Sequence, residues 1–350
     1  MEAKKHQTII VAPLDWGMGH ATRVIPIIRI LSVHYHVIVV APKKMHLMFS
    51  GEPAEIVNFP GYDIRYYPIP LWISLVLQGP KVLFRAIRTK IALKKMIRNT
   101  KPAMLFSDNR LFVRSPRIPS VYMTHQLSIR HNWKILERLI NAIHYYFINQ
   151  FDTCWVPDTP DNDIAGELSC GTVSIEKHYI GALSRFQQPD RKPEKIFRKV
   201  CILSGPEPDR SIWANKIKNL WKDKPESLII GALEGQDRFK KEGNITLSSH
   251  LNHELFAQTI FFAEVVVTRS GYTSIMDLFR LRKNAYLEPK KGQTEQEYLA
   301  KFHNGKFFKT FNDYPQTNKT VFENIPDKLD KWFCNEQQLL LLVKEQIDKK

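Results

Sequence analysis

Cysteines and long apolar runs are both scarce in this sequence, and their scarcity limits what the protein can be. The 350 residues include only 4 cysteines, and no two of them have the short spacing that ligates a metal ion. We therefore expect reduced thiols, as in a cytoplasmic protein, and no disulfide framework. No apolar run reaches the roughly 20 residues of a membrane-spanning helix, and the charged first residues lack the hydrophobic core of a signal peptide. The expectation is a cytoplasmic protein, either soluble or peripheral on the inner face of the cell membrane.

Acidic residues are outnumbered, and no acidic motif suggests a metal site. The net charge is +16, which calls for an anionic partner such as nucleic acid, anionic lipid or the phosphates of a sugar nucleotide. Signatures of the common RNA- and DNA-binding folds are absent, and aromatic residues do not alternate with basic residues along a strand. Nucleic acid is therefore the least favoured partner. The Asp-x-Asp sequence Asp161-Asn162-Asp163 indicates a polar loop, so we expect neither a metal nor another cofactor.

The order of apolar segments predicts an α/β protein of two domains, which its length also favours. A β-rich run at 8–12, helical spacing at 24–31 and a further β-rich run at 36–41 form a βαβ opening. A second series of strands begins at 200–203, after a polar, proline-containing stretch at 187–195 that is typical of a linker. Further strands are predicted at 104–106, 120–123, 153–156, 227–233, 264–268 and 284–287. We expect doubly wound domains at 1–185 and 186–335, facing across a cleft, and a helix at 336–350 that packs back on the first domain.

A glycine-containing loop, Asp15-Trp16-Gly17-Met18-Gly19-His20, follows the first predicted strand. Glycines let the backbone approach a substrate, and the following helix start attracts an anion. No third glycine completes a dinucleotide motif, and an ordinary tight turn explains the loop equally well. His20 has an unperturbed pKa suited to a general base. Asp15, which could orient His20 or act itself, and His125 are further candidates for this role.

Two loops of the second domain carry the more informative pattern. The strand at 264–268 runs into Arg269-Ser270-Gly271-Tyr272-Thr273-Ser274, and we expect a helix from about Ile275 with Asp277 in its first turn. Hydroxyls, a permissive glycine and a helix start form an anion cradle, although a plain N-cap would look similar. After the next strand, Gly292-Gln293-Thr294-Glu295-Gln296-Glu297-Tyr298 offers amides and carboxylates that suit a hydroxyl-rich ligand. Ser204-Gly205 is a third small turn, also after a strand.

These loops, in this order, resemble the UDP-sugar glycosyltransferases of the GT-B fold, and specifically the MurG-like group of glycosyltransferase family 28. The run from Thr268 to Asp277 resembles the family's nucleotide-diphosphate motif, and the run from Pro289 to Ala300 resembles its sugar-binding segment. Gly17-Met18-Gly19-His20 is similar to its N-domain glycine-rich loop. The resemblance spans most of residues 8–302. It departs at Pro206, which removes an N–H group that could meet a phosphate.

The resemblance implies a division of roles. Asp277 would bind the ribose hydroxyls, the backbone near Leu251 would pair with uracil, and His20 would lie near the acceptor. His125 and Gln126 would line the acceptor cleft, although a glutamate is expected where Gln126 stands. The donor-binding residues implied are Gly17, Gly19, Ser204, Gly205, Leu251, Arg269, Ser270, Gly271, Tyr272, Thr273, Asp277, Gln293, Gln296 and Glu297.

The reaction implied is transfer of a hexose or N-acetylhexosamine from a UDP-sugar to an acceptor hydroxyl, with inversion and without a metal. A lipid-linked acceptor or a cell-envelope glycan would fit the segment at 71–101, whose mixed apolar and basic residues can lie on an anionic bilayer. Residues 130–138 would extend this surface, and a core helix with a solvated basic face is an equally good interpretation. A UDP-sugar 2-epimerase of the same fold and a noncatalytic sugar-nucleotide-binding protein remain open alternatives.

Overall fold

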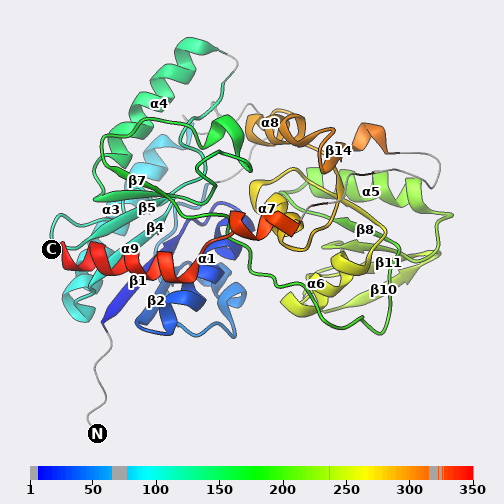
Figure 1. Ribbon diagram of the computed structural model, residues 1–350, viewed down its shortest axis with the longest axis horizontal. Coiled ribbons are helices and arrows are strands. Elements are labelled where there is room, and N and C mark those ends of the chain that lie inside the picture. Colours follow the sequence, from blue (N-terminus) through cyan, green and yellow to red (C-terminus); the bar gives the residue numbers. More distant parts are fainter. Residues whose placement is uncertain are drawn as a thin grey trace, which may run out of the picture. The chain divides into compact units, whose positions relative to one another are not determined.

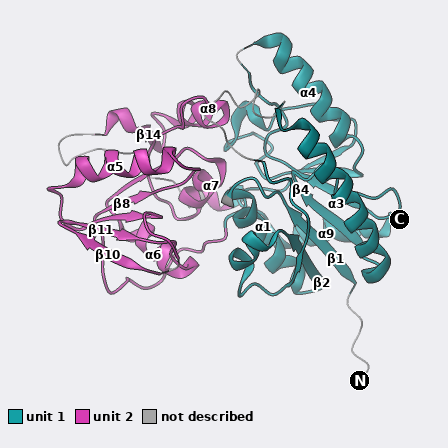
Figure 2. Cartoon of the chain, turned by 180° about the vertical axis from the view of Figure 1, so that it is seen from behind, with its two compact units in different colours: residues 1–184, 331–350 teal, residues 185–330 magenta. Residues whose placement is uncertain are grey.

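The computed structural model of the chain describes residues 7–64, 77–131, 133–235, 237–314, 322, 325 and 327–349. They form two compact units, each with its own seven-stranded sheet (Figure 2). Unit 1 comprises residues 1–184 and 331–350, and unit 2 comprises residues 185–330. Unit 2 thus ends at Asp330, slightly before the expected residue 335. Of the apolar and basic segment at 71–101, residues 71–76 lie outside the described residues.

The sheet of unit 1 is parallel throughout and is buried on both faces at its centre. Its first strand lies beside its fourth, at the point where the direction of winding reverses. In open α/β sheets, ligands bind beyond the carboxyl ends of the strands at this point. In spatial order the strands are β3 (Glu55–Asn58), β2 (His36–Ala41), β1 (Thr8–Pro13), β4 (Met104–Asp108), β5 (Ser120–Met123), β6 (Thr153–Val156) and β7 (Glu176–Tyr179).

Helices cover both faces of this sheet. Leu93 of α3 (Gly79–Thr100) packs against Leu105 of β4, and α4 (Lys134–Ile148) packs against Tyr122 and Cys154. Ser107 points to the same face as Leu105 and pairs in register with Tyr122, which pairs with Cys154. The helices α3 and α4 therefore cover the same face.

The opposite face is covered by α1 (Met18–Ser32), because β1 to β2 and β3 to β4 cross the sheet in opposite directions and such crossovers are right-handed. The C-terminal helix α9 (Glu336–Asp348) contacts α1 (Figure 1). No described helix is both long and apolar enough to cross a bilayer.

Unit 2 repeats the winding order with one antiparallel strand at its edge. In spatial order its strands are β10 (Phe239–Glu242), β11 (Ile245–Ser248), β9 (Ser227–Ile230), β8 (Lys199–Ile202), β12 (Val265–Thr268), β13 (Ala285–Leu287) and β14 (Phe308–Thr310). Only β10 pairs antiparallel among these strands. Its α-helices are α5 (Asp209–Trp221), α6 (His253–Phe262), α7 (Tyr272–Arg280) and α8 (Thr294–His303). Within the described residues of both units, the 3₁₀ helices are η1 (Lys43–Phe49), η2 (Gly166–Leu168), η3 (Phe311–Asp313) and η4 (Asp327–Trp332).

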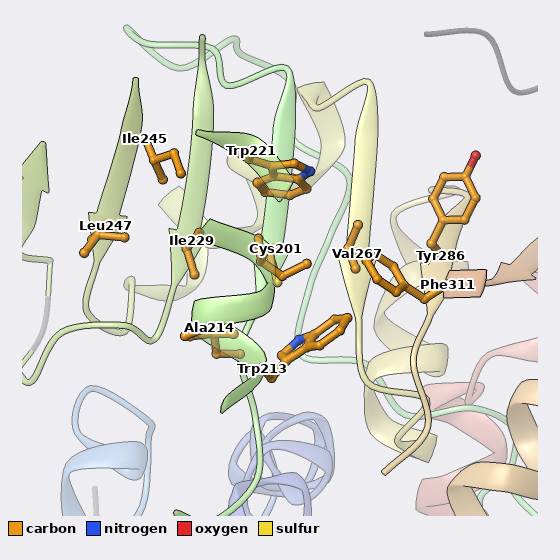
Figure 3. Close-up of a cluster of buried hydrophobic side chains, with 12 residues drawn as sticks. Cys201, Trp213, Ala214, Trp221, Ile229, Ile245, Leu247, Val267, Tyr286 and Phe311 are labelled. Atoms are coloured by element: carbon orange, nitrogen blue, oxygen red, sulfur yellow. The ribbon is translucent and has the colours of Figure 1, made fainter. Parts of the chain in front are cut away.

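The core of unit 2 holds its strands against α5. Trp213 and Trp221 of that helix pack over Cys201, Ile229 and Val267 of three neighbouring strands (Figure 3). Large aromatic side chains remove the most apolar area from water per residue. This core fixes the carboxyl ends of β8, β9 and β12, and the loops that follow them.

Candidate functional site

The carboxyl edge of the unit 1 sheet gathers the polar residues that follow three neighbouring strands. The strands β1, β4 and β5 lie side by side, and the register pairs Pro13 with Asp108 and Asp108 with Met123. His20 lies in the helix that follows β1, and His125 lies two residues after β5. Because parallel strands all end at this edge, residues far apart in the sequence meet there.

His20 and Asp108 form a hydrogen-bonded pair. The Nδ1 atom of His20 lies 2.9 Å from Oδ2 of Asp108, whose side chain has 0% exposure, while the side chain of His20 is 16% exposed. The Nη2 atom of Arg23 lies 2.7 Å from the same His20 nitrogen, but it also bonds to Oδ1 of Asp108. We therefore assign the His20 proton to Nδ1, since this choice gives both Nδ1 of His20 and Nη2 of Arg23 a carboxylate oxygen of Asp108 as acceptor. The Nε2 atom of His20 is then left with its lone pair.

Arg23 links this pair to His125. Its Nε donates to Oδ1 of Asp108 at 2.9 Å, and its Nη1 donates to Nδ1 of His125 at 2.8 Å. Arg23 is 2% exposed and His125 is 5% exposed. A neutral imidazole that accepts at Nδ1 carries its proton on Nε2, so His125 is a donor at the nitrogen that faces away from Arg23.

The electrostatics of the cluster favour a neutral His20 beside an ionised Asp108. Burial, followed by the positive charge of Arg23, lowers the pKa of His20 below its ordinary value of 6.5, and Asp108 only partly opposes this. Burial alone would raise the pKa of Asp108, but Arg23 and His20 hold it below its ordinary value. An unprotonated imidazole held by a carboxylate can accept a proton from a substrate hydroxyl.

Asp15 has a different task from the one expected. Its Oδ1 accepts from the backbone N–H of Tyr62 at 2.9 Å, and its Oδ2 accepts from the N–H of Asp63 at 3.0 Å. Lys44 lies 3.6 Å from the same carboxylate. The carboxylate of Asp15 thus holds the loop after β3, and it is Asp108 that orients His20.

The remaining unit 1 candidates lie in the same edge loops. Gly17 adopts a φ of 90° at the N-cap of α1, and a Cβ there would meet open space, so backbone conformation is what demands glycine. Gly19 already belongs to the helix, where its carbonyl accepts from the hydroxyl of Thr22. Gln126 is half-buried, and its N–H donates to the hydroxyl of Thr124.

In unit 2 the structure brings together the three loops singled out in the sequence. Lys290 forms an ion pair with Asp209, 2.6 Å apart, at the start of α5 and close after Ser204 and Gly205. The guanidinium of Arg269 stacks over the Trp213 ring of the same helix at 4.9 Å. The loops after β8, β12 and β13 therefore form one connected group at the carboxyl edge of the sheet.

The side chains of Arg269 and Ser270 are used inside this group. Nη1 of Arg269 donates to the carbonyls of Glu288 and Pro289, at 3.4 and 3.3 Å. The hydroxyl of the fully buried Ser270 donates to the carbonyl of Gln296 at 2.7 Å. The proton of the Ser270 hydroxyl is thus used within the protein, and donor binding by Ser270 stays a prediction. The same loop leads into the start of α7, and the N-terminal end of a helix is an arrangement that can bind an anion.

Gln296 and Glu297, at the start of α8, bond to the backbone of the loop that precedes them. Oε1 of Gln296 accepts from the N–H of Lys290 at 2.9 Å, and Oε1 of Glu297 accepts from the N–H of Gly292 at 2.7 Å. Gln293 is the N-cap of α8. These two bonds hold the backbone of the loop after β13. The amide nitrogen of Gln296 and the second carboxylate oxygen of Glu297 take no part in them, and groups of this kind can bond to hydroxyls.

Asp277 lies in the second turn of α7, not in the first as the sequence suggested. The helix begins at Tyr272 because Gly271 takes an extended N-cap conformation, and its first turn contains no acidic residue. Leu251 is buried beyond the end of β11, at the start of α6. Tyr272 is also buried, whereas Thr273 is half-buried.

Two residues of this cluster, Asp108 and Arg23, were not predicted from the sequence. Both were hidden by their context, because Asp108 ends a strand that was expected to stop at residue 106, and Arg23 lies inside a helix. A carboxylate at the end of the strand beside β1 was the available signal for Asp108. The described residues contain no group of three or more His, Cys, Asp and Glu side chains arranged to hold a metal ion.

Comparison with known proteins shows likeness in structure only. No family model and no curated protein matches the chain. The glycotransferase of kitacinnamycin has 15% identity and a TM-score of 0.60, over 98% of this chain and 94% of that one. The spinosyn rhamnosyltransferase has 12% identity and a TM-score of 0.58, over 86% of each chain. A UDP-glucosyltransferase from Polygonum tinctorium has 10% identity and a TM-score of 0.58, over 98% of this chain and 93% of that one.

These matches identify the architecture that the two sheets display. Each unit is Rossmann-like, with its winding reversed beside its first strand, at β1 and β4 in unit 1 and at β8 and β12 in unit 2. The two units together are the GT-B fold expected from the sequence.

Proposed function

We propose that the chain is a glycosyltransferase that moves a sugar from a nucleoside diphosphate to an acceptor hydroxyl with inversion. The observation that carries this proposal is the His20–Asp108 pair at the carboxyl edge of unit 1. The GT-B fold hosts sugar transfer in the matched proteins, which include a rhamnosyltransferase and a UDP-glucosyltransferase. The pair supplies what this reaction needs from the protein, a neutral base oriented by a buried carboxylate.

The chemistry assigned to His20 is a single proton transfer. Its Nε2 accepts the proton of the acceptor hydroxyl as the acceptor oxygen bonds to the anomeric carbon. The bond from that carbon to the terminal phosphate oxygen breaks, and the nucleoside diphosphate leaves with the bonding electrons. Attack from the side opposite the leaving group inverts the anomeric configuration. Asp108 keeps the imidazole in the reactive tautomer and stabilises the imidazolium that forms, as carboxylates do in other base–carboxylate pairs.

Donor binding is assigned to the connected loops of unit 2. The start of α7 would meet the diphosphate, and Asp277 the ribose hydroxyls. The spinosyn rhamnosyltransferase has been solved with thymidine diphosphate, and the Polygonum enzyme is a UDP-glucosyltransferase. We therefore propose a uridine or thymidine diphosphate sugar as donor. The motif resemblance favours UDP and a hexose or N-acetylhexosamine, in the manner of the MurG-like group.

The direct test is turnover with a panel of UDP- and dTDP-sugars. We expect release of the nucleoside diphosphate only when an acceptor is present, together with a product heavier than the acceptor by one sugar in mass spectrometry. A converted sugar nucleotide without an acceptor product would indicate an epimerase. Binding of nucleotide without turnover in any pairing would indicate a noncatalytic binder, and absence of both would end the proposal.

The pH profile should report His20. Because the base must be neutral and burial lowers its pKa below 6.5, we expect kcat/KM to fall at low pH, with the midpoint of this fall below pH 6.5. The charged and titratable groups that face His20 are Arg23, Asp108 and His125, and the ionised Asp108 limits how far the pKa drops. Nucleotide affinity is measured over the same pH range. If it stays constant, the fall in kcat/KM comes from protonation of His20 and not from weaker binding of the donor. An acid limb centred above pH 6.5 would contradict this assignment of the base.

A further inference from the structure

The start of helix α5 is occupied by the protein's own carboxylates. Oε2 of Glu207 accepts from a backbone N–H of the first helical turn at 3.1 Å, and its Oε1 accepts from Nε of Arg210 at 2.9 Å. Asp209 places a second carboxylate in the same turn, and Pro206 and Pro208 have no N–H group to donate. Negative charge at a helix start already balances its dipole. The loop after β8 therefore has little positive field left for the phosphates of a donor.

A lysine from another loop of unit 2 reaches this helix start. Lys290 lies three residues after β13, and its Nζ is 2.6 Å from Oδ2 of Asp209. Strand β12 lies between β8 and β13, and the three strands are parallel. The ion pair therefore spans the carboxyl end of β12, where the loop at 269–271 leads into α7. An ammonium in this place lies beside the helix start to which the proposed function assigns the diphosphate.

A second positive charge, that of Arg269, lies near the same ion pair. Burial lowers the pKa of Arg269, and the carboxylates of Glu288 and Asp209 partly oppose this. Asp209 is therefore close enough to act on Arg269 as well as on Lys290. Arg269 is only 9% exposed, and its guanidinium stacks over Trp213, whose place in the core Figure 3 shows. The side chain of Lys290 is 23% exposed, so of these two cations Lys290 is the more accessible to a ligand.

The transfer step produces more negative charge than a helix start can balance. When the bond from the anomeric carbon to the terminal phosphate oxygen breaks, the nucleoside diphosphate gains one full negative charge. A helix start is equivalent to about half an elementary charge of the opposite sign. A lysine ammonium carries a whole charge and three donors, and a positive group fixed where charge develops lowers the barrier. Lys290 therefore suits the leaving group in both charge and position.

We propose that Lys290 binds the diphosphate of the sugar nucleotide, exchanging its partner Asp209 for phosphate oxygens, and this inference rests on the proposed function. Before the donor binds, Asp209 holds the ammonium beside the start of α7. Once the donor is bound, the ammonium acts as a point charge on the phosphates, a common use of lysine. Asp209 repels the same phosphates, so the two members of the ion pair have opposite effects on donor affinity.

The test is calorimetric titration of the full chain with UDP and dTDP, together with titration of uridine and thymidine followed by NMR. We expect Lys290→Met to bind the diphosphate that the wild type prefers about tenfold more weakly, because a charge-assisted bond is lost. Affinity for the matching nucleoside should stay within about twofold, since only the phosphates meet the ammonium. Lys290→Arg keeps the charge and should recover most of the lost affinity.

Asp209→Asn separates phosphate binding by Lys290 from a role of the ion pair in joining the two loops. This variant breaks the same ion pair, yet it should bind the diphosphate more tightly than the wild type, because a repelling carboxylate is removed. An ion pair that only joined the loops would weaken binding in both variants. The matched control is Lys218→Met, which breaks a 2.9 Å pair with Glu242 at the other end of α5, where the lysine is 32% exposed. It should leave the diphosphate affinity unchanged.

Two results would overturn the assignment of Lys290 and leave the proposed function standing. One is a diphosphate affinity that Lys290→Met does not change, and the other is an equal loss of affinity in Lys290→Met and Asp209→Asn. If Lys290→Met did not fold, as judged by circular dichroism, the sign of the Asp209→Asn effect would decide. A wild type that binds neither diphosphate would overturn the proposed function, and the assignment of Lys290 with it.

Discussion

Replacing His20 by alanine is expected to lower kcat by about 10²- to 10⁴-fold, the usual contribution of a general base. The affinity for the nucleoside diphosphate should stay within about twofold, because His20 lies in unit 1 and its contacts are to Asp108 and Arg23. Single-turnover kinetics with saturating donor, together with calorimetric titration of the nucleotide, measure the two quantities separately.

A matched control is His36→Ala, since His36 is an exposed histidine at the start of β2, on the opposite edge of the same sheet. It should leave both quantities unchanged. If His20→Ala weakened nucleotide binding as much as it lowered kcat, His20 would be a donor-binding residue and the assignment of the base would fail.

Replacing Asp108 by alanine is expected to destabilise unit 1 by about 3–5 kcal/mol. The reason is that Arg23, 2% exposed, would keep a buried positive charge without its carboxylate partner. Asp108 accepts from Nε and Nη2 of Arg23 and from His20, so its loss removes three bonds at once. Urea unfolding, followed by the fluorescence of Trp155 in unit 1 after replacement of the other tryptophans, measures the change.

Two further variants separate charge from shape. The double variant Arg23→Met/Asp108→Leu removes both charges and should recover most of the lost stability, since no buried ion remains. Asp108→Asn keeps the shape, but its amide supplies one acceptor in place of two, so the reactive His20 tautomer is lost and kcat should fall with a smaller loss of stability. If Asp108→Ala lowered the free energy of unfolding by less than about 1 kcal/mol, Arg23 would have found another partner or water in the variant.

The fold could be predicted because its strands are short apolar runs with clear ends. The expected strands at 36–41, 120–123 and 153–156 agree with β2, β5 and β6. The hairpin of β10 and β11 was missed, because β10 is exposed along its whole length and carries no apolar pattern. An antiparallel strand added at the edge of a parallel sheet leaves little trace in hydropathy.

The site could be predicted only loop by loop. His20 and His125 were found because each follows a strand, but Arg23 was not, because its role depends on partners 85 and 102 residues away. Local patterns show which residues lie at an edge of a sheet. They do not show which of those residues share a hydrogen bond.

For the loop after β12, at 269–271, the sequence did not show which groups the side chains bond. Its residue types suggested side chains directed at a ligand, yet Arg269 bonds to the backbone of the loop after β13, and Ser270 bonds to the backbone of α8. A serine that caps a neighbouring carbonyl and a serine that binds phosphate have the same local sequence. Burial decides between them, and burial of Ser270 depends on the packing of α8 (Thr294–His303) against the loop.

Because the segment from residue 331 onward returns to unit 1, the two units are completed in a definite order during synthesis. The N–H of Ala182 donates to the carbonyl of Trp332 at 2.7 Å, and its carbonyl accepts from the N–H of Cys334 at 3.0 Å. Unit 2 is one continuous stretch of chain, whereas unit 1 is interrupted by it. A ribosome therefore releases all of unit 2 before it releases the residues that complete unit 1. Domains fold as units in the order in which they emerge, so the unit that carries His20 is completed after unit 2, although its first strand is made before unit 2 emerges.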